Sequence, residues 1–217
     1  MPRLIARGWS IPAGLLFLSI IPVGAGLLRL TEIASNAAVT PDNARFLAAQ
    51  LPTWAHITGG SLLLVLGAFQ FSAPLRQRNP RWHRWSGRVA VVAGIVSAIA
   101  GVWMTATFPD EPGNPAHLYG FRMTFGLGWA ACLALGLRAA LRRDIPSHRA
   151  WMLRGYAIAL GAGTTVLTFG FWLLIGGSDS ALVTTWSITA AWVLNLAIAE
   201  LIIRRHATRP TLQGAPA

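Results

Sequence analysis

Four of the five histidines in this chain stand at the ends of apolar segments. His56 and His117 each open such a segment, whereas His83 and His148 each come just before one. Ionisable side chains in or beside apolar spans are functional candidates. Neutral imidazole is an axial ligand of haem iron, and a helix bundle can hold a porphyrin between histidines on facing helices. The pattern predicts two axial pairs, His56 with His117 and His83 with His148.

Small and cationic residues accompany these histidines. Glycines that would leave room for a flat ring follow about one turn after the first and third histidines, at Gly59, Gly60 and Gly120. Arginine can hold haem propionates through bidentate hydrogen bonds. The candidates are Arg84, Arg88, Arg149 and Arg154 on the side of His83, and Arg122 on the side of His56. We therefore expect two haem b groups, or one haem b on the side of His83.

The composition requires that these residues be placed by membrane helices. The chain has 217 residues, of which 54% are apolar and 12% charged, against about 25% charged in a soluble domain. A span needs roughly 20 apolar residues. Six segments satisfy this, near 10–30, 54–73, 87–107, 118–140, 152–176 and 181–203. The sequence predicts an all-α polytopic membrane protein with six transmembrane helices, in which spans two to five form a four-helix core.

The arginines predict the orientation of these spans. All 18 basic residues are arginines, and fifteen of them cluster before the first span, in the two links that follow spans two and four, and after the last span. Positive loops face the cytoplasm, so both termini should be cytoplasmic. The net charge of +11 is explained by topology and not by nucleic acid. We expect one domain over residues 1–205, with an uncleaved first span and a disordered tail over 206–217.

A weak internal repeat supports two equivalent halves. The segment His56-Ile57-Thr58-Gly59 resembles His117-Leu118-Tyr119-Gly120, and Trp82-His83-Arg84-Trp85 resembles His148-Arg149-Ala150-Trp151. This arrangement resembles the ascorbate-reducible di-haem transmembrane cytochrome b family. That family has six spans and takes its ligands from spans two and four on one side and three and five on the other. The resemblance implies electron transfer across the membrane, from a cytoplasmic or quinol donor to an acceptor on the outer side.

A second resemblance covers residues 56 to about 166. The matching motifs are His56-x-x-Gly59, Leu66-Gly67-Ala68-Phe69-Gln70-Phe71, Arg76 with His83-Arg84-Trp85-x-Gly87-Arg88, and His148-Arg149-x-Trp151-Met152-x-Arg154-x-Tyr156. They resemble a bacterial family of predicted membrane proteins, the domain of unknown function 2306. The resemblance implies a membrane fold in the bacterial cytoplasmic membrane and carries no established reaction.

Other interpretations remain open. The histidines could contact lipid phosphate at the interface of a cofactor-free protein, such as a small transporter or an accessory subunit. No charge lies in the middle of a predicted span, which argues against an ion-coupled transporter. A metal site made by His56 and His117 alone would lack carboxylate or thiolate ligands. Walker, GxSxG, HExxH and CxxC motifs are absent from the sequence, so NTP hydrolysis, serine hydrolysis and zinc peptidase chemistry have no support.

Three smaller expectations concern packing. Gln70 should hydrogen-bond a neighbouring helix, although a cofactor is an alternative partner. Glu200 should pair with Arg204 at i, i+4. The small residues of Gly161-Ala162-Gly163 should allow close helix approach. His206, in the expected tail, is assigned no role.

Overall fold

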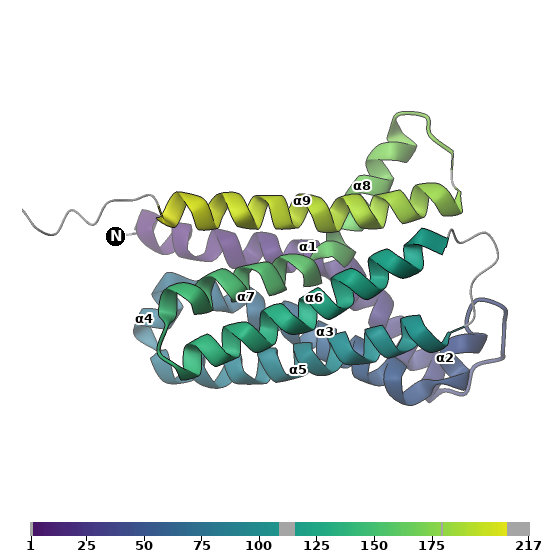
Figure 1. Ribbon diagram of the computed structural model, residues 1–217, viewed down its shortest axis with the longest axis horizontal. Helices are drawn as coiled ribbons and strands as arrows, with labels where there is room; N and C mark the ends of the chain where they lie inside the picture. The colour runs from purple at the N-terminus through teal and green to yellow at the C-terminus, as the bar shows by residue number, and fades with distance from the viewer. Residues whose placement is uncertain (1, 109–115, 179, 208–217) are drawn as a thin grey trace, which may run out of the picture.

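The structure is a computed structural model that describes residues 2–108, 116–178 and 180–207. Helices account for all the regular secondary structure in these ranges (Figure 1). They are α1 (Pro2–Ala34), α2 (Ala44–Ala48), α3 (Gln50–Gln70), α4 (Ala73–Arg78), α5 (Pro80–Thr107), α6 (Ala116–Leu141), α7 (Ile145–Ala159), α8 (Gly161–Leu174) and α9 (Ala181–Ala207). The expected all-α class is confirmed. Of the expected tail, residues 208–217 lie outside the described ranges, and His206 belongs to α9.

Five of the described helices are long and apolar enough to cross a membrane by themselves. These stretches are Gly8–Ala34, Gln50–Gln70, Pro80–Thr107, His117–Leu141 and Leu182–His206. The predicted fifth span, 152–176, is formed by two helices. It consists of α7 and α8, which meet at an angle of 48°. Counted as one broken span, the pair brings the number of crossings to six.

Contacts with the peripheral helices explain the break at Leu160. Asn195 of α9 bridges the two segments, because its amide nitrogen donates to the Ala157 carbonyl (3.1 Å) and its amide oxygen accepts from the Thr164 hydroxyl (3.1 Å). A side chain at Gly161 would collide with the Trp192 ring, and one at Gly163 with a backbone oxygen of α1. The packing role predicted for these glycines is confirmed. Hydrogen bonds with a side chain of a neighbouring helix make such a break in a span tolerable in lipid.

Helices α3, α5, α6 and α7 form a ring. Each packs on the next, and α7 returns to α3, so α3 faces α6 and α5 faces α7 across the centre. The middle of the ring is filled by Leu133 of α6, which is 1% exposed. Its methyl groups lie against Gly94 of α5 and Gly155 of α7, so a Cβ at either glycine would come within 2.9 Å of them. The predicted core of spans two to five is confirmed, with α1 and α9 packed outside it.

The two ends of the bundle differ in their residues. At one end lie the beginning of α1, the short α4, the α6–α7 turn and the last residues of α9 (Figure 1). We call this the arginine-rich end, because Arg76, Arg78, Arg81, Arg142 and Arg143 belong to it. The opposite end, where α2 lies, we call the cavity end. Both described chain ends share the arginine-rich end, as an even number of crossings requires. Its location in the cytoplasm stays a prediction.

The stability of the fold should depend on the close packing of α3 on α5. A Cβ at Gly59 would collide with the backbone oxygen of Ala93 and lie 3.0 Å from the Ser97 side chain. We expect Gly59→Ala to destabilise the protein by about 1–3 kcal/mol, as other overpacked cores are. The measurement is the midpoint of thermal unfolding in one detergent. Gly128→Ala is the matched control, because nothing lies within 4 Å of a Cβ there. Equal midpoints for the two variants would contradict the close contact.

Candidate functional site

A cavity of about 590 Å³ opens at the cavity end of the bundle. Its walls come from α3, α5 and α6 of the ring, from the α7–α8 bend, and from α1, α2 and α9. Ligand sites in proteins usually enclose 300–1,000 Å³ and combine an apolar lining with a few polar groups. This cavity follows that pattern. The charged and imidazole side chains in its described lining are His56, Arg45 and Arg122.

His56 is held by α5 in a defined orientation. Its Nδ1 lies 2.9 Å from the backbone oxygen of Ser97, and the Ser97 hydroxyl donates to the His56 carbonyl oxygen at 2.6 Å. A carbonyl can only accept, so in the neutral ring Nδ1 carries the proton and Nε2 carries the lone pair. A hydrogen bond from the non-ligating ring nitrogen, here Nδ1, is the usual way in which a protein orients a ligating imidazole.

Gly101 makes this position of His56 possible. A Cβ on Gly101 would lie 2.9 Å from His56 Nδ1 and 3.0 Å from Cε1. Any larger residue would therefore push the ring away from α5. Because Ser97 and Gly101 are four residues apart on one helix, the same face of α5 both binds the imidazole and leaves room for it.

Aromatic rings line the cavity beside this histidine. Phe125 of α6 stacks on Trp192 of α9, with ring centroids 4.6 Å apart and an interplanar angle of 24°. Trp129 also belongs to the wall. Its indole N–H is buried and, among the described residues, has no hydrogen-bond partner. Buried polar atoms in native proteins almost always have a hydrogen-bond partner, so an unpaired indole N–H beside a cavity calls for an explanation.

His117 lies outside the described lining of this cavity. Its ring is 5.4 Å from the Trp186 ring and 5.9 Å from the Phe121 ring, and the residue is exposed. The residues that α6 contributes to the wall begin at Leu118 and include Arg122. The structure therefore brings His56 and Arg122 to one cavity but does not bring His117 there. Its role as a haem ligand stays a prediction.

His83 and His148 occupy equivalent positions at the arginine-rich end. Asn79 caps α5 and Asp144 caps α7, each by accepting a backbone N–H three residues later, at 3.1 Å. Hydrogen bonds from Ser147 lower the pKa of the exposed Asp144 carboxyl, which keeps this cap charged. Each histidine follows its cap by four residues, so both lie in the first turns of facing helices. They are close enough to interact electrostatically.

His148 has the same kind of support as His56. Its Nδ1 lies 2.9 Å from the backbone oxygen of Gly136 on α6, which again leaves the Nε2 lone pair available. In both cases the carbonyl comes from a neighbouring core helix. The two anchored histidines thus lie at opposite ends of the ring, one on α3 and one on α7.

The remaining predicted arginines have different surroundings. Arg84, Arg88 and Arg149 are exposed at the arginine-rich end. Arg154 instead forms a bidentate pair with Glu200 of α9, with Nε–Oε1 and Nη2–Oε2 distances of 2.5 and 3.1 Å. Its guanidinium also lies 4.8 Å from the Trp151 ring centroid. The expected partner Arg204 is also close enough to Glu200 to interact electrostatically. The bidentate contact of Glu200, however, is with Arg154, which is 46 positions away in the sequence.

Gln70 packs between helices as expected. Its amide nitrogen donates to the Ser86 hydroxyl of α5 at 2.9 Å, and that hydroxyl donates to the Trp82 carbonyl at 2.7 Å. The helix–helix role of Gln70 is confirmed. Within the described residues no group of three or more histidine, cysteine or acidic side chains could hold a metal ion.

Arg45 is the charged residue of the described cavity lining that sequence reasoning missed. It lies in α2, within the 31–53 stretch that links the first two spans, and it reaches the cavity wall from there. The signal that could have found it is the scarcity of arginine on that side of the predicted spans, where only Arg29, Arg45 and Arg122 lie.

The matching family model covers the helices that build this site. The model described as predicted membrane protein (DUF2306) matches residues 53–203, which include all four candidate histidines. The chain belongs to the DUF2306 family. As a member of it, the chain is a predicted integral membrane protein, and the matched region begins at α3 and leaves out α1 and α2. Neither a curated protein nor a solved structure matches the chain.

The Arg154–Glu200 pair should hold α9 to α7. Both residues lie near the ends of the predicted spans 152–176 and 181–203 and are partly buried, with side-chain exposures of 25% for Arg154 and 36% for Glu200, so a lone charge there is poorly solvated. We expect Glu200→Gln to destabilise the protein by about 1–3 kcal/mol, since it leaves Arg154 without its carboxylate. The charge swap Arg154→Glu with Glu200→Arg should recover part of this loss. Thermal unfolding in detergent measures both.

Glu32→Gln is the matched control for this test. It breaks the Arg29–Glu32 pair (2.6 Å), which joins neighbouring turns of one helix near its end. Pairs of this kind contribute only about 0.3–0.5 kcal/mol. If Glu32→Gln and Glu200→Gln lowered stability equally, the special weight given to the interhelical pair would be wrong.

Proposed function

We propose that this protein is a b-type cytochrome that moves electrons within the cytoplasmic membrane of a bacterium. The observation that carries the proposal is the shared anchoring of His56 and His148. Each donates Nδ1–H to a backbone carbonyl of a neighbouring core helix, at 2.9 Å, and so keeps Nε2 available as a ligand. A histidine that merely contacted lipid phosphate at the interface would not need this hydrogen bond from Nδ1 to a backbone carbonyl.

The donor set at the cavity end fits a haem. The cavity volume of about 590 Å³ suits a ligand of that size class, and its walls are largely apolar and aromatic. His56 would supply an axial nitrogen, and Arg122 a cation for a propionate. His117 remains the predicted second ligand. Bound haem supplies one-electron redox chemistry, while the protein provides the ligand, the orientation and the exclusion of water.

At the arginine-rich end, His83 and His148 would hold the other haem. They lie on α5 and α7, which face each other across the ring, and Arg84 and Arg149 follow them directly in sequence. From His56 to the level of Gln70 the rise of α3 is about 21 Å. The two sites would thus lie at the two ends of a span, separated by the packed layer around Leu133. We propose a quinol or a small reductant as electron donor and an acceptor on the outer side.

Haem content and histidine variants test this proposal. The protein is purified in detergent from cells supplied with haem, and absorption spectra are recorded before and after dithionite reduction. We expect reduced b-type bands at about two haems per chain. His148→Ala should remove one haem and His56→Ala the other, because each loses an axial nitrogen. His117→Ala should remove the haem that His56→Ala removes if the predicted pair is correct.

His206→Ala is the control, because the hydrogen bond that His206 makes among the described residues is to the Ile202 carbonyl of its own helix, at 2.8 Å. It should keep the full haem content. One haem per chain that depends on His148 alone would reduce the proposal to a single site at the arginine-rich end. A protein free of haem under these conditions would refute the cytochrome and favour the cofactor-free alternative, a small transporter or an accessory subunit.

A further inference from the structure

We propose that Trp129 faces His56 across the cavity, and that the space between them is an open ligand position for a small uncharged molecule with a hydrogen-bond acceptor. The inference rests on the proposed function, because His56 would hold the haem iron, and it assigns no second protein ligand on the opposite side. Carbon monoxide belongs to this class of molecule and binds reduced haem where an axial position is free. The cavity haem would thus bind a ligand from outside the protein as well as carry electrons.

The contacts between α5 and α6 set the level of Trp129 in the bundle. Two contacts fix the register of these antiparallel helices, because an added Cβ would come within 2.8 Å of the partner side chain: Gly126 with Val102, and Gly94 with Leu133. His56 lies against α5 at Ser97 and Gly101, between these two contacts. The part of α6 at the level of His56 is therefore the stretch between residues 126 and 133, which contains Trp129.

Trp129 belongs to the side of α6 that faces into the ring. It is 8% exposed, lines the cavity, and shares a cluster of buried residues with Leu63 of α3 and Ala98 of α5. Since α3 and α6 face each other, His56 and Trp129 occupy opposite walls at the same level. The indole N–H has no hydrogen-bond partner among the described residues. An acceptor atom bound between the two walls would supply that partner, which a buried donor requires.

Two other side chains bear on the identity of a second ligand, His117 and Met104. His117 precedes Trp129 by more than three turns of α6, about 18 Å, and its ring rests on Trp186. Met104 is the imidazole or sulfur side chain that the described lining contains besides His56. It belongs to α5, the helix to which His56 Nδ1 is bonded. The Nε2 lone pair points away from that bonded edge, so a ligand opposite His56 must come from another wall.

Aromatic rings complete the wall where α5 ends. Phe46 and Phe108 both line the cavity and pack edge-on, with centroids 5.8 Å apart. The guanidinium carbons of Arg29 and Arg45 each lie 4.6 Å from the centroid of the Phe46 ring. The polarity, hydrogen-bond donors and steric access of the pocket decide what a haem binds. These rings add to the apolar wall, which favours a small uncharged ligand over a hydrated ion.

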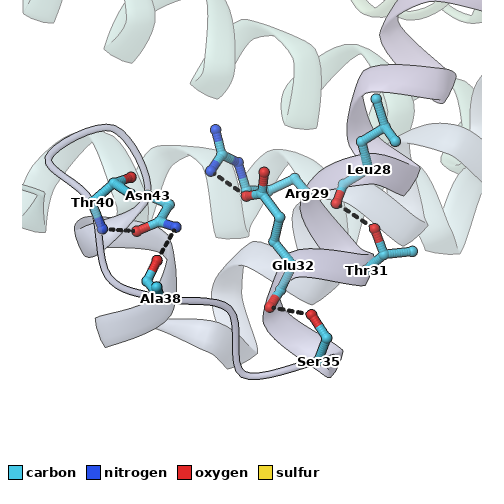
Figure 2. Close-up of polar contacts among 8 residues, drawn as sticks. All are labelled: Leu28, Arg29, Thr31, Glu32, Ser35, Ala38, Thr40 and Asn43. Carbon is cyan, nitrogen blue, oxygen red and sulfur yellow. Dashed lines mark hydrogen bonds and ion pairs between the residues drawn. The ribbon is translucent and has the colours of Figure 1, made fainter.

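The link between α1 and α2 holds Phe46 at this wall. Figure 2 shows its contacts: the Thr40 N–H donates to the Asn43 Oδ1 at 2.7 Å, and the Asn43 amide donates to the Ala38 carbonyl at 3.0 Å. Asn43 directly precedes α2 and is 5% exposed. A helix of five residues does not persist alone, so these bonds help to keep α2, and with it Phe46, against the cavity. Access to the ligand position is thereby restricted by an ordered segment.

Carbon monoxide binding tests the open position. The protein is purified in detergent with its haem and reduced with dithionite, and difference spectra are recorded during a titration with carbon monoxide. We expect about one carbon monoxide per chain, because one axial position is free. His56→Ala should lose this binding, whereas His148→Ala should keep it. His117→Ala should keep both the binding and the cavity haem, since His117 lies outside the described lining.

Infrared spectra of the carbon monoxide complex test the role of Trp129. Trp129→Phe keeps an aromatic ring but removes the N–H, so the C–O stretching frequency should rise. The Kd for carbon monoxide should increase about two- to tenfold, the effect of losing one hydrogen bond. Haem content and thermal unfolding identify a variant that is not folded, and the comparison of the wild type with His117→Ala then carries the test.

Trp192→Phe is the matched control, because it makes the same change in a residue that lines the same cavity. The N–H edge of Trp192 lies against Gly161 of α8, where an added Cβ would be 2.5 Å from the indole nitrogen. That edge is therefore directed at the α7–α8 bend, and the variant should keep the frequency and the Kd of the wild type.

The outcomes separate the open position from the cytochrome. If a haem that depends on His56 is present but the wild type binds no carbon monoxide, the open position is wrong and the cytochrome stands. Binding that appears only in His117→Ala would make His117 the second ligand and would overturn the open position in the same way. Equal frequencies in Trp129→Phe and Trp192→Phe would show that Trp129 is not the donor. A protein without a haem that depends on His56 refutes the cavity haem and this inference together.

Discussion

The close contact of α3 with α5 is the constraint on which the candidate sites depend. Gly59 lets the two backbones approach, and Ser97 and His56 then exchange two hydrogen bonds across the interface. At the other end of the same pair, Gln70 bonds Ser86. Helices in lipid gain little from burying apolar surface against each other, so small residues and interhelical hydrogen bonds decide how they pack. The rotation of α3 on α5, and with it the direction of His56, follows from these contacts.

The α6–α7 pair makes the same kind of contact at the arginine-rich end. His148 on α7 bonds the carbonyl of Gly136 on α6, as His56 on α3 bonds that of Ser97 on α5. In each pair a histidine near the start of one helix uses a backbone acceptor of its neighbour. That acceptor comes from a helix interior, where a carbonyl already receives an intrahelical bond and has a second lone pair to offer. The two contacts involve His56 and His148, which are not equivalent positions of the weak sequence repeat, since that repeat pairs His56 with His117 and His83 with His148.

Polar residues inside the bundle are satisfied within the protein, as lipid requires. The Tyr156 hydroxyl donates to the Leu64 carbonyl at 2.9 Å, so α7 is bonded to α3, its neighbour in the ring. Asn195 does the same between α9 and the α7–α8 bend. Trp129 is the described exception, and it lies at the cavity. A structure that satisfies its other buried groups but leaves this one unpaired beside a cavity is consistent with a site for a ligand.

The sequence by itself determined the membrane class, the place of the apolar spans and the family, because hydropathy and short motifs are local features of the chain. It also identified Gln70 as a packing residue and the histidines as helix-end residues. It could not find the Arg154–Glu200 pair, the break at Leu160 or the position of Arg45 at the cavity. Those features depend on how helices distant in sequence rotate against one another, and apolar spans carry almost no periodic signal for that rotation. Only the tertiary structure decided that His56 lines a cavity while His117 rests on Trp186.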